Sequence, residues 1–258
     1  MSKLTLTFLG TGTSQGVPVI GCKCPVCLSS DPKDNRLRTS VMISYEDSNI
    51  VIDTGPDFTL QMLNNKVQTL EAVVFTHAHK DHIAGLDDIR PFNFMSKKDM
   101  EVYSTSDVLE ALSKDYHYIF DPSFSYPGIP RVKHNLISKS DTFQIADKKW
   151  TPIEVMHYKL PVLGYRIDDL VYITDANYIS DHELEKIKGC KTLVINALRR
   201  EKHISHFTLE EAIELSNQIQ PERTYLTHVS HLMGLHEEVS LELPPNIHFA
   251  FDGLKIEC

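Results

Sequence analysis

Six consecutive residues in the first third of the chain hold four side chains that can bind a metal ion. The run is His77-Ala78-His79-Lys80-Asp81-His82, and it directly follows the apolar segment Val73-Val74-Phe75-Thr76. An apolar run of this kind indicates a buried strand, and neutral imidazole and carboxylate are good ligands for zinc and similar divalent metals. Solvated loop histidines are the alternative, but a buried cluster without partners would be costly and an exposed one has no reason to follow a buried strand. We therefore expect a metal site at the end of this strand.

The His-x-His-x-Asp-His motif after a strand resembles the signature of the metallo-β-lactamase superfamily, and the resemblance extends over nearly the whole chain. It implies a hydrolase with an α/β fold, a four-layer αββα sandwich, and a site for two catalytic divalent metals, zinc or manganese. In that family three more ligands come from later strands. The matching positions are His157, Asp175 and His228, each at the end of an apolar run. Considered alone, His157 or His228 would more often be a structural histidine than a metal ligand.

The resemblance also divides the ligands between two ions. One ion would be held by three histidines, His77, His79 and His157. The other would be held by Asp81, His82 and His228, with Asp175 bridging the two. Asp53, in Asp53-Thr54-Gly55, matches an early motif of the family, and we expect it to orient ligating histidines by hydrogen bonds. A plain aspartate in a strand-end turn is the alternative.

Three of the five cysteines crowd into Cys22-Lys23-Cys24-Pro25-Val26-Cys27, a spacing too tight for ordinary disulfides and suited to a metal clamp. Together with the opening Gly10-Thr11-Gly12-Thr13-Ser14-Gln15-Gly16, this run resembles the phosphodiesterase branch of the superfamily that includes PhnP, a phosphoribosyl 1,2-cyclic phosphate phosphodiesterase. That branch carries a structural zinc on three such cysteines and a distant histidine, matched here by His231. Reduced free thiols are the alternative, and a disulfide is disfavoured in the cytoplasm. We expect Cys190 in the core and Cys258 as an exposed tail thiol.

Members of the same branch have a histidine just before a helix, and this chain resembles them in having His206 in Ser205-His206-Phe207-Thr208. The resemblance implies a general acid that protonates the leaving oxygen, while Asp81 could orient the attacking water. His203 could be the acid instead, or either histidine could simply cap the helix. Arg199 and Arg200 precede His206 and could bind a second substrate phosphate, although a solvated surface pair is the more ordinary explanation.

Hydrophobic periodicity and capping residues predict the remaining elements. Strands are expected at residues 4–9, 40–45, 50–53, 72–75, 150–156, 164–167, 170–174, 192–196, 223–227 and 248–251. Helices are expected at 107–119, from Ser180 to Gly189 and from Thr208 toward Pro221, with a further helical stretch beginning at Ile83. Capping boxes are expected for Ser180 with Glu183 and for Thr208 with Glu211. We expect residues 1–258 to form a single domain.

The chain is acidic, with a net charge of −9 over 258 residues, so its surface as a whole repels a polyphosphate backbone. A small-molecule phosphodiester is the expected partner, and nucleic acid is disfavoured. No apolar run reaches the roughly 18 residues of a membrane span, and the start Met1-Ser2-Lys3-Leu4-Thr5 lacks a signal-peptide pattern. We therefore expect a cytoplasmic location without membrane contact. Relatives imply a homodimer, which no stripe in the sequence identifies.

The expected activity is hydrolysis of a small cyclic phosphodiester, such as phosphoribosyl 1,2-cyclic phosphate, by a hydroxide activated by two metals. A tRNA 3′-processing endonuclease of the same fold is one rival, but we find no basic Gly/Pro-rich arm for gripping tRNA. A thioester hydrolase, which would not need His206, is a second rival, and a binding protein without turnover is a third. The Pro- and Gly-containing segment 121–131 is either a lid over a pocket or a plain surface connection.

Overall fold

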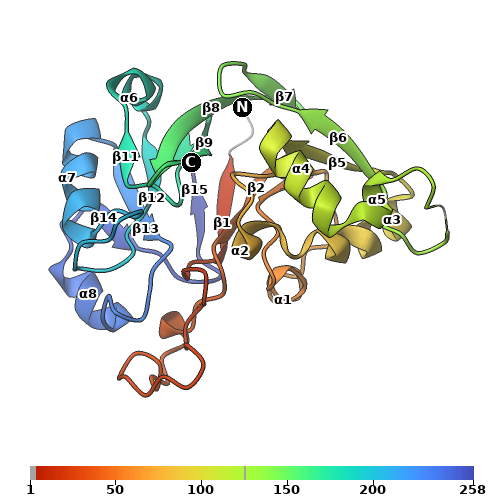
Figure 1. Cartoon of the computed structure of the whole chain (residues 1–258). Coiled ribbons are helices and arrows are strands. Elements are labelled where there is room, and N and C mark those ends of the chain that lie inside the picture. Colours follow the sequence, from red (N-terminus) through yellow and green to blue (C-terminus); the bar gives the residue numbers. More distant parts are fainter. Residues whose placement is uncertain (1–3, 125) are drawn as a thin grey trace.

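Two sheets pack face to face, and helices cover both outer surfaces (Figure 1). The computed structural model describes residues 4–124 and 126–258. The segment Met1 to Lys3, part of the signal-peptide argument, lies outside these residues, as does Ser125 of the segment 121–131. The arrangement is the four-layer αββα sandwich that the sequence predicts.

The first sheet has seven strands, antiparallel on one side and parallel on the other. In spatial order they are β15 (Lys255–Glu257), β1 (Thr5–Gly10), β2 (Ser40–Tyr45), β3 (Ser48–Ile52), β4 (Ala72–Val74), β5 (Met100–Ser104) and β6 (Val132–Leu136). From β3 to β6 all neighbours are parallel. The carboxyl ends of β3 and β4 therefore meet at one edge, where Asp53 and His77 follow.

The second sheet has eight strands and repeats this division. Its path is β11 (Tyr178–Ile179), β8 (Lys148–His157), β9 (Leu160–Ile167), β10 (Leu170–Tyr172), β12 (Thr192–Asn196), β13 (Arg223–Thr227) and β14 (Ile247–Phe249), and β7 (Phe143–Ile145) also pairs with β8. The strands from β10 to β14 are parallel. Their carboxyl ends bring Asp175 and His228 to a common edge.

Helices complete the outer layers. Next to the first sheet lie α1 (Phe58–Asn64), α2 (Lys80–Ile83), α3 (Arg90–Ser96), α4 (Ser106–Asp115) and α5 (His117–Phe120), with a short 3-10 turn at Leu86–Ile89. Next to the second lie α6 (Asp181–Ile187), α7 (Leu209–Ile219) and α8 (His236–Glu242) (Figure 1). A second 3-10 turn, at Pro32–Asp34, contacts the start of α8, where the His236 N–H donates to Asp34. No helix in the described part of the chain is long and apolar enough to span a bilayer.

The alternation of side chains along each strand produces the layers. In β3, Ile50 and Ile52 point into the cluster between the sheets, whereas Val51 joins the cluster under the first helical layer. In β12, Val194 faces the central cluster and Leu193 faces the second helical layer. Such strands are apolar on both faces because both are covered. Burial of each large side chain contributes roughly 1.5–3 kcal/mol.

Several local predictions need correction. The helix beginning at Lys80 ends at Ile83 instead of starting there, because the chain turns at Gly85, which packs against the backbone of Gly55. The predicted helix 107–119 is interrupted at Tyr116.

Two further differences concern side chains. Thr208 forms a full capping box with Glu211, but Ser180 receives only the backbone N–H of Glu183, whose carboxylate instead accepts from the Glu154 N–H. Cys258 is not an exposed tail thiol, since it is partly buried against the central core, whereas Cys190 is buried as predicted.

Candidate metal centre

The predicted catalytic ligands come together at the edge where the two sheets meet. His77, His79, Asp81 and His82 follow β4, and His157 ends β8. Asp175 follows β10, and His228 follows β13. Asp53, Asp175 and His228 have positive φ angles of 67°, 53° and 56°. This left-handed conformation is unfavourable for residues other than glycine and is concentrated at functional sites.

Asp175 lies at the middle of the cluster. One carboxylate oxygen is 2.9 Å from Nδ1 of His228 and 3.5 Å from Nε2 of His82. The other carboxylate oxygen is 3.8 Å from Nε2 of His77. Because the two oxygens face imidazoles on opposite sides, this carboxylate is placed as a bridge between two ions would be.

His77, His79 and His157, the three histidines predicted to hold one ion, lie close to one another. Nε2 of His77 is 3.0 Å from Nδ1 of His79, and the ring centroid of His157 lies 5.1 Å from that of His79. Nδ1 of His157 donates to the Ser205 carbonyl oxygen at 2.8 Å. That bond fixes the tautomer, so Nε2 of His157 is left as the metal-binding nitrogen.

Ligand atoms within 4.8 Å of one another form three sets around Asp175. The sets are His77 with His79 and Asp175, His82 with Asp175 and His228, and His157 with Asp175 and His206. Two features differ from the predicted division. His157 lies closer to His206 than to the His77 pair, and Asp81 belongs to none of the three sets. The Asp81 carboxylate is nevertheless 3.2 Å from Nε2 of His82.

Asp53 supports the cluster from behind, as the sequence predicts. Its buried carboxylate accepts from the backbone N–H and the hydroxyl of Thr76, each at 2.8 Å. It also lies 2.7 Å from Nδ1 of His82. This contact turns Nε2 of His82 toward the cluster. Asp81 is part of the His-x-His-x-Asp-His motif, whereas the hydrogen bond from the Thr76 hydroxyl to Asp53 is not predicted from the sequence.

Gly55 explains why the Asp-Thr-Gly segment ends in glycine. A Cβ atom at this position would lie 2.2 Å from the carbonyl oxygen of Asp81, a distance at which two heavy atoms cannot coexist. The loop that carries the ligands after β4 therefore packs directly on the backbone of Gly55.

The donors present fit divalent metal ions. Nε2 of His82 is buried and faces carboxylate oxygens of Asp81 at 3.2 Å and Asp175 at 3.5 Å, but it forms no well-directed hydrogen bond among the described residues. A cation placed between this nitrogen and the two carboxylates would be held by all three groups. Imidazole with carboxylate is the donor set of zinc, manganese and iron sites, so the chemistry of the cluster, as well as its position, favours a metal centre.

His77 and Asp175 have the charge states that bind a cation, whereas the carboxylates of Asp175 and Asp53 outweigh burial and raise the pKa of His82 well above its ordinary value. Burial lowers the pKa of His77 well below its ordinary value, which keeps the imidazole neutral. Burial alone would raise the pKa of Asp175, but His228 and His82 hold it well below its usual range. A neutral imidazole and an ionised carboxylate are the forms that bind metal.

His206 is buried beside the cluster, and its ring centroid lies 4.5 Å from that of His157 and 4.8 Å from that of His228. Its Nδ1 has no hydrogen-bond partner among the described residues. Burial, together with His228, lowers the pKa of His206 to about 2. His203 is 5.2 Å away between centroids, and its Nδ1 contacts the Ser205 hydroxyl at 3.2 Å. The structure thus places His206 closer to the ligands than His203.

The two arginines before His206 are already engaged. Arg199 donates to the carbonyl oxygens of Glu201 and Lys202 in its own loop. Arg200 pairs with Glu242 at 2.7 Å and donates to the Met233 carbonyl. These contacts favour the ordinary explanation of a surface pair over a phosphate clamp.

The predicted structural zinc residues also converge, although they are far apart in sequence. Cys22, Cys24, Cys27 and His231 form one group of closely spaced ligand atoms. Nδ1 of His231 is 3.4 Å from Sγ of Cys22 and 3.3 Å from Sγ of Cys24. The backbone N–H of Cys27 lowers the pKa of Cys24 to about 6. A thiolate is the zinc-binding form, so this group fits a closed Cys₃His site.

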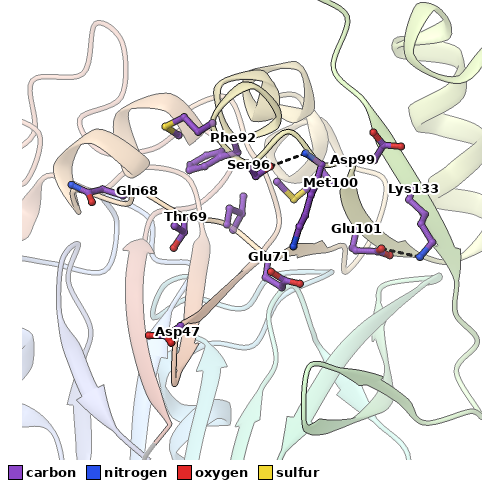
Figure 2. A pocket seen from close by; sticks show the side chains of 13 residues that line it. Asp47, Gln68, Thr69, Glu71, Phe92, Ser96, Asp99, Met100, Glu101 and Lys133 are labelled. Carbon is purple, nitrogen blue, oxygen red and sulfur yellow. Dashed lines mark hydrogen bonds and ion pairs between the residues drawn. The ribbon is translucent and has the colours of Figure 1, made fainter.

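The larger hollows of the molecule lie away from both clusters. One, of about 690 Å³, opens at the amino ends of β4 and β5 and is lined by the carboxylates of Asp47, Glu71, Asp99 and Glu101 (Figure 2). Another, of about 720 Å³, lies between α3 and the segment 121–131, and no residue of the metal cluster lines it. The described residues of the segment therefore line a hollow that is separate from the metal centre. A smaller hollow of about 330 Å³ does reach Thr76 and His77.

Residues 48–229 match the model of the beta-lactamase superfamily domain. The chain belongs to the metallo-β-lactamase superfamily. A solved structure described as a new diphosphatase from the PhnP family is 38% identical to it, with a TM-score of 0.92 over 99% of this chain and 98% of the other. This similarity confirms the predicted resemblance to the PhnP branch, and the chain is a hydrolase of this superfamily.

Two curated relatives match less of their own length. An octanoyltransferase from Porphyromonas gingivalis is 42% identical over 249 residues, which is 96% of this chain and 50% of that protein. A ribonuclease Z from Clostridium kluyveri is 37% identical over 62 residues, 23% of this chain and 20% of that protein. The chain thus spans half or less of the length of these relatives.

Proposed function

We propose that the protein hydrolyses a small cyclic phosphodiester, phosphoribosyl 1,2-cyclic phosphate or a close analogue. The observation that carries the proposal is the position of Asp175 between two groups of histidines. This arrangement suits two divalent ions, zinc or manganese, and the 38% identity to a PhnP-family diphosphatase supports phosphorus–oxygen chemistry.

Two ions held there would supply the chemistry of a binuclear hydrolase, lowering the pKa of water and offsetting charge on the phosphoryl oxygens. His77, His79 and His157 would hold one ion, His82 and His228 with Asp81 the other, and Asp175 both. Asp81 lies beside His82, where its carboxylate would accept a hydrogen bond from the attacking water and orient it. Asp53 holds the His82 ring in place throughout.

His206 would serve the leaving oxygen. Its ring stacks on His228 at an interplanar angle of 21°, and its buried Nδ1 has no partner among the described residues. As a neutral imidazole it has one N–H to donate. An anionic phosphodiester placed beside it raises its pKa through charge attraction, so that it can donate a full proton as the alkoxide departs.

The surroundings favour a small substrate. The hollow that reaches His77 is about 330 Å³ and is lined by apolar side chains such as Leu136, Leu160 and Leu163, which suits an organic fragment and not a duplex. The net charge of −9 opposes long polyanions. The structural zinc on Cys22, Cys24, Cys27 and His231 would fasten the amino-terminal loop to the segment after β13.

Thioester hydrolysis is the second candidate. The Porphyromonas relative carries the name octanoyltransferase, which denotes acyl transfer, and this chain corresponds to half of that protein. Metal-bound hydrolases can attack an acyl carbonyl as well as phosphorus. A thiolate leaving group does not need protonation by His206, and this difference separates the two candidates.

The test is turnover by metal-replete protein of phosphoribosyl 1,2-cyclic phosphate, a 2′,3′-cyclic nucleotide and an octanoyl thioester, with Asp175→Ala as the blank. The proposal predicts selective cleavage of the ribosyl cyclic phosphate and a loss of roughly 100-fold or more in His206→Ala. Thioester cleavage that survives His206→Ala, without phosphodiester cleavage above the blank, would reject the phosphodiesterase and favour the second candidate.

A further inference from the structure

The amino-terminal Gly-Thr-Gly-Thr-Ser loop lies directly beside the metal centre. The hydroxyl of Thr13 is 3.3 Å from Nε2 of His228, and the Thr13 N–H donates to the carbonyl oxygen of Val229. Gly12 lies between two neighbouring segments, bridging to Arg38 on one side and Val229 on the other. These contacts fix the next two residues of the loop, which are exposed, at the edge of the centre.

Gly12 makes this approach possible. A Cβ atom there would lie 2.8 Å from the carbonyl oxygen of Arg36, so a larger residue would push the loop away from the segment that carries Arg38. With glycine in place, Nε of Arg38 donates to the carbonyl oxygen of Ser14 at 3.2 Å. The Arg38 side chain is thereby joined to the loop that contacts His228.

The base of the Arg38 side chain also lies near the Asp53-Thr54-Gly55 segment. A Cβ atom at Gly55 would lie 2.2 Å from the carbonyl oxygen of Asp81 and 3.6 Å from Cβ of Arg38. The base of the arginine is therefore close to the loop that carries the ligands after β4. Nη1 pairs with Asp57 at 2.9 Å, and the Arg38 backbone N–H donates to the same carboxylate.

The guanidinium of Arg38 retains unused donors. An arginine has five N–H donors, and the described residues engage one at Nε and one at Nη1. The two N–H groups of Nη2 and the second of Nη1 have no partner among the residues that the structure describes, and 31% of the side chain is exposed. Ser14 and Gln15 beside it are exposed and polar. Arg199 and Arg200 also use two side-chain donors each, so Arg38 is distinguished by its hydrogen bond to the loop that contacts His228.

We propose that Arg38, assisted by the exposed side chains of Ser14 and Gln15, binds a non-reacting phosphate of the substrate while the phosphodiester occupies the metal centre. The proposal rests on the proposed function and deepens it. Two N–H donors on one edge of a guanidinium can bond to two oxygens of one phosphate. The ion pair with Asp57 holds the Arg38 guanidinium in one orientation.

The first test compares two substrates that differ by a single phosphate, phosphoribosyl 1,2-cyclic phosphate and ribose 1,2-cyclic phosphate. Arg38→Ala is expected to raise the KM of the phosphorylated substrate about 10- to 100-fold and to change that of the other much less. Arg38→Lys keeps the charge but loses the paired donors, so its KM should lie between those of the wild type and Arg38→Ala. Added guanidinium should partly restore the KM of Arg38→Ala.

A matched control is Arg131→Ala. Arg131 also pairs with an aspartate at 2.9 Å, Asp99, and is more exposed, but it lies at the amino end of β6, away from the centre. Equal KM changes for both substrates in Arg38→Ala, or the same pattern in Arg131→Ala, would overturn the proposal.

A direct binding measurement separates this proposal from the proposed function. Ribose 5-phosphate is titrated calorimetrically into metal-replete wild type, Arg38→Ala and Arg131→Ala. We expect binding to weaken about 10-fold or more only in Arg38→Ala. If the wild type cleaves neither cyclic phosphate, the proposed function fails, yet this titration still decides the role of Arg38. Unchanged affinity in Arg38→Ala would reject it.

Discussion

The carboxylate of Asp175 lies 2.9 Å from the imidazole of His228, although the two residues follow different strands, β10 and β13. Both residues have left-handed backbone angles, so the turns after the two strands direct their side chains toward each other. The same carboxylate belongs to every set of ligand atoms around the catalytic centre. Its removal should therefore affect both halves of the site together.

Asp175→Asn is expected to reduce the metal content of the catalytic centre and to lower turnover on the order of 100-fold or more, because a neutral amide is a poor bridge between cations. Metal content per chain by mass spectrometry and kcat/KM are the readouts. Asp169→Asn is the control, since Asp169 is half-exposed and paired with Lys191 on the surface. Retained metal and turnover in Asp175→Asn would contradict the bridging role.

Asp53→Asn tests the support behind His82. The carboxylate accepts two hydrogen bonds from Thr76 and orients His82, and an amide cannot accept all three. We expect metal affinity to fall about 10- to 100-fold with the fold retained. Competition with a chromophoric chelator measures the affinity, and circular dichroism checks the fold. An unchanged affinity would show that the His82 ring is held by packing alone.

Cys24→Ser is expected to remove one zinc per chain without emptying the catalytic centre. Loss of the Cys₃His clamp frees the segment between Thr13 and Arg38, so the melting temperature should fall by several degrees. Elemental analysis and calorimetry in the presence of zinc provide the readouts. The control is Cys258→Ser, because Cys258 is remote from the cluster and only partly buried. Cys190→Ser is unsuitable as a control because Cys190 is buried in the core.

His236 predicts a pH dependence of stability outside the metal centre. Its Nδ1 lies 3.2 Å from the guanidinium of Arg36, and burial, followed by the charges of Arg36 and Lys33, lowers its pKa to about 4. An unfolded chain protonates histidine near pH 6.5. Between pH 6.5 and 4 the unfolded state therefore binds more protons, and the free energy of unfolding falls as the pH is lowered.

The measurement is urea unfolding at pH 7.5 and pH 5 for wild type and His236→Gln. The variant should lose less stability on acidification, by up to about 1.4 kcal/mol per pH unit below pH 6.5. Burial raises the pKa of the nearby Asp252 to about 6, which acts in the opposite direction, so only the difference between proteins is diagnostic. The exposed His182 supplies the control His182→Gln. Parallel pH profiles for wild type and His236→Gln would refute the prediction.

The sequence predicts the elements that are buried on both faces. Strands β2, β12 and β13 agree with the predicted bounds. The apolar runs of β12 and β13 end at polar residues that begin loops of the site, whereas β2 ends in the turn at residues 46–47, at the opposite edge of its sheet. Strand β6, Val-Lys-His-Asn-Leu, was missed, since it lies at the sheet edge and only part of each side chain is covered. Its pairing with β5 is a tertiary effect that no local pattern indicates.

The candidate ligands were similarly predictable, but their neighbours were not. A histidine or aspartate at the end of a strand has a visible local signal. The contact of Thr13 with His228, and that of His157 with the Ser205 carbonyl, join residues that are 215 and 48 positions apart, so the sequence alone gives no indication of them. Arg38 was missed for the same reason, because its importance depends on the packing of Gly12 and Gly55 around it.

The most direct test of the binuclear site is a metal titration of turnover. Metal-stripped protein that retains zinc only at its cysteine site is titrated with manganese or zinc while hydrolysis of phosphoribosyl 1,2-cyclic phosphate is followed. The account predicts that activity rises until about two further equivalents per chain are bound, and that Asp175→Asn stays inactive throughout. Full activity before any metal is added, or no hydrolysis of the cyclic phosphate at saturation, would contradict it.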